Sequence, residues 1–236
     1  MKILLSIALL TTALVTFASA TEPRAENRKG ERLFQQGEFA TAADAFQAAA
    51  ASASSQNLDP AVPLFNAGVA RLRAADSEQA ASGFLAATRT PDLTLQSLAY
   101  FNAGTVRLLQ IQQASQAGQA SNVLAQLAQS IECLEQSLMI KPGRAETRHN
   151  LEVALTYRAA ILAALARLVA AMDSAGRQVA QHQFVEAHQT LQQAGNELAT
   201  ALPLHPDQQK QFEQLLERTG QISEILKATE TGSSGP

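Results

Sequence analysis

The chain contains a single cysteine, Cys133, among its 236 residues, so no disulfide can form within it. Cys133 precedes a leucine in an expected helix, where we expect a small buried hydrophobic side chain rather than a reactive thiol. The folded state must therefore depend on its hydrophobic core.

Aromatic residues make up only 5% of the chain, and β-branched runs are absent. Alanine, leucine, glutamine and glutamate dominate instead, and these residues favour helices. The formal net charge is −3, and there is no basic block and no alternation of basic with aromatic residues. The composition predicts an all-α protein and disfavours a nucleic-acid partner.

The motifs of common catalytic and metal sites are also missing. The sequence has no HExxH, no cysteine or histidine pair at metal-ligand spacing, no glycine-rich phosphate loop and no nucleophile elbow. We therefore predict no catalytic, cofactor-binding or metal-binding residues, and a protein that is not an enzyme. The four histidines are scattered, and we expect each on the surface: His149, His182, His188 and His205.

The first twenty residues (1–20) have the pattern of a secretory signal peptide. Lys2 precedes an apolar stretch, and Ala18-Ser19-Ala20 forms an A-x-A cleavage site. We expect cleavage after Ala20 and a periplasmic or otherwise exported protein; an uncleaved N-terminal anchor is the alternative. The longest later apolar stretch, 159–172, contains Arg167, so we expect no membrane span in the mature chain.

The most informative pattern that is present is a repeat. Phe-Asn-Ala-Gly occurs at 65–68 and again at 101–104, thirty-six residues later. Segment 37–46 also aligns with segment 75–84 at a shift of thirty-eight, which pairs Phe46 with Phe84. We predict that both rings are buried at equivalent places in successive hairpins. Periods of roughly 34–40 residues are typical of helical hairpins, which stack because one hairpin cannot bury its apolar face alone.

These residues resemble the tetratricopeptide repeat (TPR), and the resemblance covers roughly 24–200. That family has a small residue within the first helix of each hairpin, a glycine and an aromatic residue at the turn, and spaced small and large residues along the second helix. A helical bundle without repeats is the alternative. The matching residues are Gly30, Gly37, Phe39, Ala42, Phe46 and Ala49; then Leu64, Ala67, Gly68, Ala80, Phe84 and Ala87; then Tyr100, Ala103, Gly104, Ser130, Leu134, Ser137 and Lys141-Pro142; and, more weakly, Gln183, Phe184, Ala187, Leu191 and Ala194.

The resemblance implies an all-α, TPR-like α-solenoid of antiparallel helical hairpins with a C-terminal helical extension. Within a repeat region at 21–158 we expect hairpins at about 24–54, 61–92 and 97–142, and a closing helix from 145 to about Met172. Residues 159–228 are expected to form a degenerate hairpin, with a helix to Leu202, and a capping helix over 207–228; 229–236 is expected to be a disordered tail. The apolar residues of the capping helix are Phe212, Leu215, Leu216, Ile222, Ile225 and Leu226.

The third expected hairpin is longer than the others. Asn102 and Asn150 are forty-eight residues apart, against thirty-six between Asn66 and Asn102, a surplus of twelve (48 − 36). The surplus falls at 110–121, where apolar residues keep helical spacing. We predict two extended helices that meet near Gly118 and project beyond the solenoid.

Asparagine occupies the same register in three successive hairpins, at Asn66, Asn102 and Asn150. In TPR proteins an asparagine in this part of the first helix commonly binds the backbone of an extended peptide, so the resemblance implies a peptide-binding groove in which these amides face solvent. The alternative is an asparagine that caps or bridges helices. Arg71 and Arg107 are also thirty-six residues apart, and we expect them either to border the groove and attract acidic groups or to lie on a solvated face.

By resemblance, the chain is expected to be a non-catalytic, exported scaffold that binds protein partners through its concave groove. It is most similar to the exported TPR proteins of Bat aerotolerance-type operons, which implies membrane-anchored von Willebrand A-domain proteins as partners. A structural component of an envelope or peptidoglycan-associated assembly, acting through oligomerisation, is one alternative. A degenerate hydrolase or ligand-binding helical domain is another.

Overall fold

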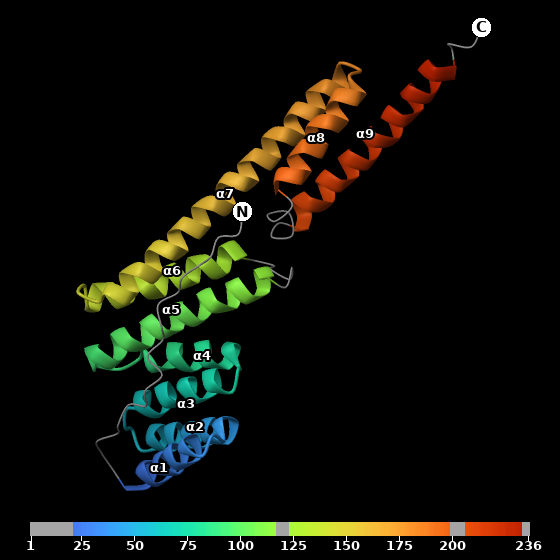
Figure 1. Ribbon diagram of the computed structural model, residues 1–236. Helices are drawn as coiled ribbons and strands as arrows, with labels where there is room; N and C mark the ends of the chain where they lie inside the picture. Colours follow the sequence, from blue (N-terminus) through green and yellow to red (C-terminus); the bar gives the residue numbers. More distant parts are fainter. Residues whose placement is uncertain (1–20, 117–122, 199–205, 233–236) are drawn as a thin grey trace. The chain divides into compact units, whose positions relative to one another are not determined.

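The computed structural model describes residues 21–116, 123–198 and 206–232 (Figure 1). Every regular element within these segments is an α-helix, and the all-α prediction is confirmed. The helices are α1 (Thr21–Gln35), α2 (Phe39–Ser55), α3 (Ala61–Arg73), α4 (Ser77–Ala87), α5 (Leu93–Gln116), α6 (Val123–Ile140), α7 (Ala145–Ala180), α8 (Phe184–Leu198) and α9 (Pro206–Gly232).

The helices divide into two compact units. The N-terminal unit contains α1 to α4, most of α5 and α6, and α7 up to Leu155. The C-terminal unit contains α7 from Thr156 onward, α8 and α9, with the facing ends of α5 and α6. In the N-terminal unit α1 packs on α2, α2 on α3 and α3 on α4, so helices that follow one another in the chain lie side by side (Figure 1).

Local sequence signals set several helix starts. α3 begins directly after Pro60, whose ring pre-sets a helical φ. α4 begins after Asp76, whose side chain accepts a hydrogen bond from the Gln79 amide at 3.1 Å and so satisfies one free donor of the first turn.

Four turns between consecutive helices share one geometry. The residues with positive φ are Gly37, Asn57, Ala75 and His182, at 82°, 56°, 62° and 62°. In each turn this residue donates its N–H to the carbonyl three positions earlier, and the next residue donates to the carbonyl five positions earlier; the first turn does so with Phe34 and Leu33, at 3.1 and 2.9 Å. This pairing caps the carbonyls at the end of a helix and returns the chain antiparallel to it.

The core of the N-terminal unit repeats a contact between a glycine and a large side chain. Phe46 and Phe84 have no exposed surface, as predicted. A Cβ on Gly30 would lie 2.7 Å from the Phe46 ring, and a Cβ on Gly68 would lie 2.9 Å from the Phe84 ring. Gly104 stands in the same relation to Leu134, at 2.8 Å. In three successive helix pairs the absence of a side chain on the first helix therefore makes room for a large one on the second.

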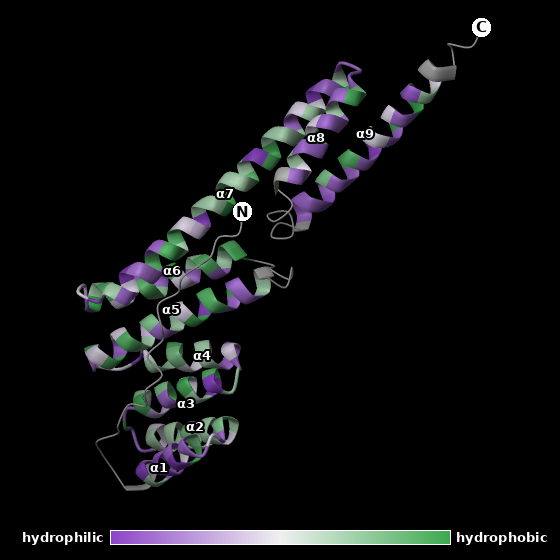
Figure 2. Ribbon diagram, in the orientation of Figure 1, coloured by the Kyte–Doolittle hydropathy of each residue, from purple (hydrophilic) through white to green (hydrophobic). Residues whose placement is uncertain are grey.

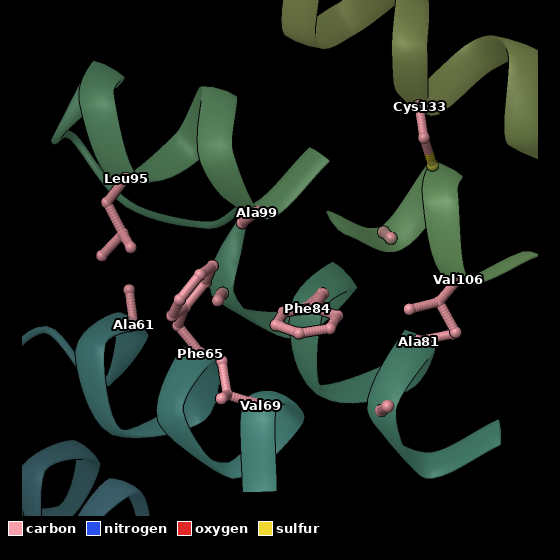
Figure 3. Close-up of a cluster of buried hydrophobic side chains, with 12 residues drawn as sticks. Ala61, Phe65, Val69, Ala81, Phe84, Leu95, Ala99, Val106 and Cys133 are labelled. Carbon is pink, nitrogen blue, oxygen red and sulfur yellow. The ribbon is translucent and has the colours of Figure 1, made fainter. Parts of the chain in front are cut away.

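Around Phe84 the core spans α3, α4 and α5 and reaches Cys133 on α6 (Figure 3). The rings of Phe65 and Phe84 lie 5.2 Å apart at 58°, a tilted arrangement that is favourable for aromatic pairs. The alanines surrounding them let the helices approach closely. Other buried members of this cluster are Ala61, Val69, Ala80, Ala81, Ala87, Leu95, Ala99, Ala103, Val106 and Cys133.

The extended third helix pair is present, with α5 of 24 residues and α6 of 18. Its expected turn near Gly118 lies outside the described residues. Buried serines join the two helices: Ser137 donates to the Ser97 carbonyl at 2.8 Å, and Ser130 donates to the Gly104 carbonyl at 2.8 Å.

In the C-terminal unit α8 packs on α9. Gly195 faces Phe212, at 3.2 Å from its Cβ position, and Gly220 faces His188, at 2.9 Å, so the two helices are antiparallel. The cluster they share with α7 includes Leu168, Ala175 and Leu191. Because Ala175 and Val179 continue this buried face, α7 does not end near Met172 as expected but runs to Ala180.

The last helix also differs from expectation. α9 continues to Gly232, so the predicted disorder of 229–236 is wrong for 229–232, where no residue before Gly232 interrupts the helix; 233–236 lie outside the described residues. Leu202, the expected end of the preceding helix, lies outside them too. Of the residues expected to face the core, Phe212 is buried, but Ile222, Ile225 and Leu226 are 36%, 63% and 38% exposed. Their exposure follows from the lengths of the two helices. Gly220 of α9 faces His188, which lies only one turn after the start of α8, so the turns of α9 beyond Gly220 extend past the start of α8.

The expectation that Arg167 breaks the apolar stretch of α7 is wrong, whereas the expected absence of a membrane span stays a prediction. Among the described residues, α7 is long and apolar enough to cross a bilayer, judged by length and composition alone. Arg167 does not interrupt it as expected, because one charge leaves the surrounding stretch strongly apolar. Core helices of water-soluble proteins meet the same criterion, so the finding is weak grounds for a membrane span.

Candidate functional site

The three asparagines of the predicted groove are buried. Asn66 on α3, Asn102 on α5 and Asn150 on α7 each have no exposed surface, so the expectation that their amides face solvent is wrong. The register places each amide on the packed side of its helix, where helices approach closely. An amide without exposed surface cannot reach a bound peptide unless the helices separate.

The best-defined of these amides joins two helices. Asn150 donates its Nδ2–H to the Thr105 hydroxyl oxygen at 2.9 Å, and Thr105 donates in turn to the Phe101 carbonyl at 2.8 Å. Both side chains are fully buried, so α7 is tied to α5 by a polar contact inside the N-terminal unit. A buried polar group needs such a partner, and this geometry favours the helix-bridging alternative.

Arg71 and Arg107 occupy equivalent registers but have different neighbours. The Arg71 guanidinium forms an ion pair with Asp44 on α2; the Arg71 side chain is 16% exposed, whereas that of Asp44 is 67% exposed. Arg107 is half-buried and lies beside Cys133 on α6. Each arginine has a buried Nε without a hydrogen-bond acceptor, and a buried Nε is out of reach of a carboxylate from outside.

Cys133 is buried, and the prediction of a small interior side chain is confirmed. Burial raises the pKa of its thiol, an effect that the neighbouring Arg107 cation opposes. A thiol with a raised pKa is protonated at neutral pH and is a poor nucleophile.

The five predicted residues therefore do not converge on one point. Arg71 pairs with Asp44 on α2, and Arg107 lies beside Cys133 on α6. Asn150 donates a hydrogen bond to Thr105 on α5. Sequence reasoning missed the buried pair of Ser97 and Ser137, although Ser137 stands where the other hairpins carry a small alanine.

The histidines divide into two kinds. His149 and His182 are exposed as expected, and His205 lies outside the described residues. His188 is half-buried, which corrects the prediction: its ring fills the space above Gly220, and its Nδ1 lies 3.3 Å from the Leu216 carbonyl oxygen. A glycine in the interior of the last helix was the available signal.

His188 borders the open depression between α8 and α9. Three exposed carboxylates share the rim, from Glu213, Glu217 and Glu224. They make this rim acidic. Over the described part of the chain, no group of three or more histidine, cysteine, aspartate or glutamate side chains is arranged to hold a metal ion.

Comparison of the chain with protein-family models, with curated proteins and with solved structures gives no match.

Proposed function

We propose that this chain is a non-catalytic, TPR-like scaffold that binds a protein partner through the surface of its N-terminal helix pairs. The observation that carries the proposal is the recurring contact of Gly30 with Phe46, Gly68 with Phe84 and Gly104 with Leu134. A packing unit that recurs along the chain is typical of repeat proteins, whose extended surfaces serve binding.

The compartment and partner class follow from the resemblance. The first twenty residues direct export, and membrane-anchored von Willebrand A-domain proteins are the proposed partners. In this proposal the buried asparagines set the spacing between helices and do not contact the partner. Recognition falls to Arg71 and Arg107, which border the groove and attract carboxylates of the partner through the positive charge of their guanidinium groups.

A binding experiment tests this role. The chain is used to capture proteins from an envelope extract, and the dissociation constant is then measured for the captured partner. Hydrogen bonds to charged groups contribute roughly 1.5–3 kcal/mol each. Arg71→Gln combined with Arg107→Gln is therefore expected to weaken binding at least about tenfold, since about 1.4 kcal/mol is a decade.

Two controls separate recognition from folding. Asp44→Asn removes the ion pair but leaves the Arg71 guanidinium in place, so binding should be retained. Arg89→Gln removes an exposed arginine elsewhere in the same unit and should have no effect. Undiminished binding by the double variant, with an unchanged melting temperature, would remove the arginines from the site.

A further inference from the structure

α7 is apolar on two opposite faces. On one face Ala164, Leu168 and Ala175 pack into the core of the C-terminal unit. On the other, Leu162 and Val169 are 48% and 43% exposed. Figure 2 shows hydrophobic residues recurring along the helix. A helix that is apolar all round normally has a partner on each side, so the second face is the feature to explain.

The exposed face has the spacing of a helix-pairing seam. Ala159, Leu162, Ala166 and Val169 are all exposed and follow one another at steps of three, four and three residues. This is the period at which two helices remain in contact along their length. We call these four residues the α7 seam.

The seam is complementary to itself. Small and large residues alternate along it, so an antiparallel copy places Leu162 opposite Ala166 and Val169 opposite Ala159. A parallel copy places large residues opposite large ones and alanine opposite alanine, which leaves gaps between the alanines. Self-complementarity of this kind suits a two-fold symmetric contact, in which both copies use the same patch.

Charges flanking the seam favour the same orientation. Arg158 precedes it and the exposed Asp173 follows it. Antiparallel pairing brings Arg158 of each copy toward Asp173 of the other, whereas parallel pairing brings like charges together at both ends. Arg167, also exposed, lies to the side of the seam, so its guanidinium stays in water.

From this geometry we infer that two copies of the chain associate antiparallel through the α7 seam, with Leu162 of one copy against Ala166 of the other. One helix face is smaller than a standard interface of about 1,600 Å². The association is therefore reversible, with a dissociation constant on the order of micromolar or weaker. It is independent of partner binding at the N-terminal unit.

Sedimentation velocity of the full chain over a range of concentrations tests the inference. The unmodified chain should shift from monomer to dimer as its concentration rises. Leu162→Glu places two charges in the centre of the contact and should weaken dimerisation at least about tenfold. Leu226→Glu, at another exposed leucine of the C-terminal unit, is the matched control and should dimerise normally.

Charge reversal tests the orientation. Arg158→Asp and Asp173→Arg should each weaken self-association, because each gives a copy two like charges at the ends of its seam. Mixed together, the two variants should form a heterodimer, since every cross-pair is then attractive. Arg71→Gln combined with Arg107→Gln should leave dimerisation unchanged, which separates this inference from the proposed partner binding.

Four results would overturn the inference. They are a wild-type chain that stays monomeric at every concentration, a dimer that survives Leu162→Glu, reversed-charge variants that remain monomeric when mixed, and a monomer that binds phospholipid vesicles through the seam without self-association. The last result would identify lipid as the occupant.

Discussion

At the scale of single residues, the packing of the N-terminal unit depends on positions without a side chain. Gly30, Gly68 and Gly104 each face a large group closer than a Cβ atom tolerates. Glycine lowers helix stability, so its presence inside these helices reflects the space it leaves for the neighbouring helix.

Gly68→Ala should destabilise the protein. The new Cβ would lie 2.9 Å from the Phe84 ring and 3.2 Å from the Ala80 carbonyl oxygen, and neither the buried ring nor the backbone can move freely. Overpacking typically costs about 1–3 kcal/mol, against a gain in helix propensity of about 1 kcal/mol. Gly176→Ala in α7 is the matched control, because its Cβ meets nothing within 4 Å and should raise the free energy of unfolding. Denaturant titration of both variants decides; equal effects would mean that the Gly68 contact is absent.

Asn150→Ala should also destabilise the protein, because it leaves the buried Thr105 hydroxyl without its donor. The expected loss is about 1–3 kcal/mol. Thr105→Val removes the other partner, and the double variant should lose less than the sum of the two single losses. Strict additivity in denaturant titrations would contradict a direct contact between the two side chains.

At the scale of elements, the turns explain why the helices return antiparallel. Gly37, Asn57, Ala75 and His182 adopt the same left-handed conformation, although only the first is a glycine. Each is held by two hydrogen bonds to the end of the preceding helix. At Ala75 and His182 these hydrogen bonds therefore hold a residue with a Cβ in a positive-φ conformation that it would otherwise avoid.

Ala75→Gly should therefore stabilise the turn between α3 and α4. An alanine at φ 62° carries a steric penalty of about 1–2 kcal/mol that glycine does not, although glycine also gains freedom in the unfolded chain. We expect a net gain of about 0.5–1 kcal/mol in the free energy of unfolding. Ala74→Gly, at a neighbouring φ of −78°, should instead lower it. Melting curves of the two variants should move in opposite directions.

Sequence spacing predicted the helices and the burial of Phe46 and Phe84, because both follow from residues close together in the chain. It did not predict the burial of Asn66 and Asn102. A polar side chain is assigned to solvent by default, and only the approach of the next helix decides otherwise.

The same limit applies to contacts between distant helices. The contact of the His188 ring with Gly220 depends on how α8 aligns with α9. The exposure of Ile225 depends on where α8 begins, because the overhanging end of α9 has no α8 residues beside it. Neither relation leaves a periodic signal in one helix alone.

At the scale of the whole molecule, the chain is two compact units that share one continuous helix, α7. Each unit has its own buried cluster, around Phe84 in the N-terminal unit and around Phe212 in the C-terminal unit. Because the two cores are separate, a destabilising substitution in one unit should lower the stability of that unit and leave the other largely unchanged.

Phe84→Ala should lower the free energy of unfolding of the N-terminal unit by about 3–5 kcal/mol, as expected for a buried aromatic residue. Amide hydrogen exchange should accelerate in α3 and α4 but remain unchanged in α8 and α9. Phe212→Ala is the reciprocal variant and should accelerate exchange in α8 and α9 alone. Faster exchange throughout the chain in either variant would show that the two units unfold together.

The contact of α1 with α2, of α2 with α3 and of α3 with α4 has a consequence for how the protein is made. Each helix packs on the one that directly precedes it in the chain, so packing can begin before the whole chain has emerged into the compartment where it folds. The N-terminal unit requires nothing beyond Leu155 and can close its core before the rest of α7 has emerged. Short separations between contacting residues also favour rapid folding, which limits the time that nascent apolar surface spends in water.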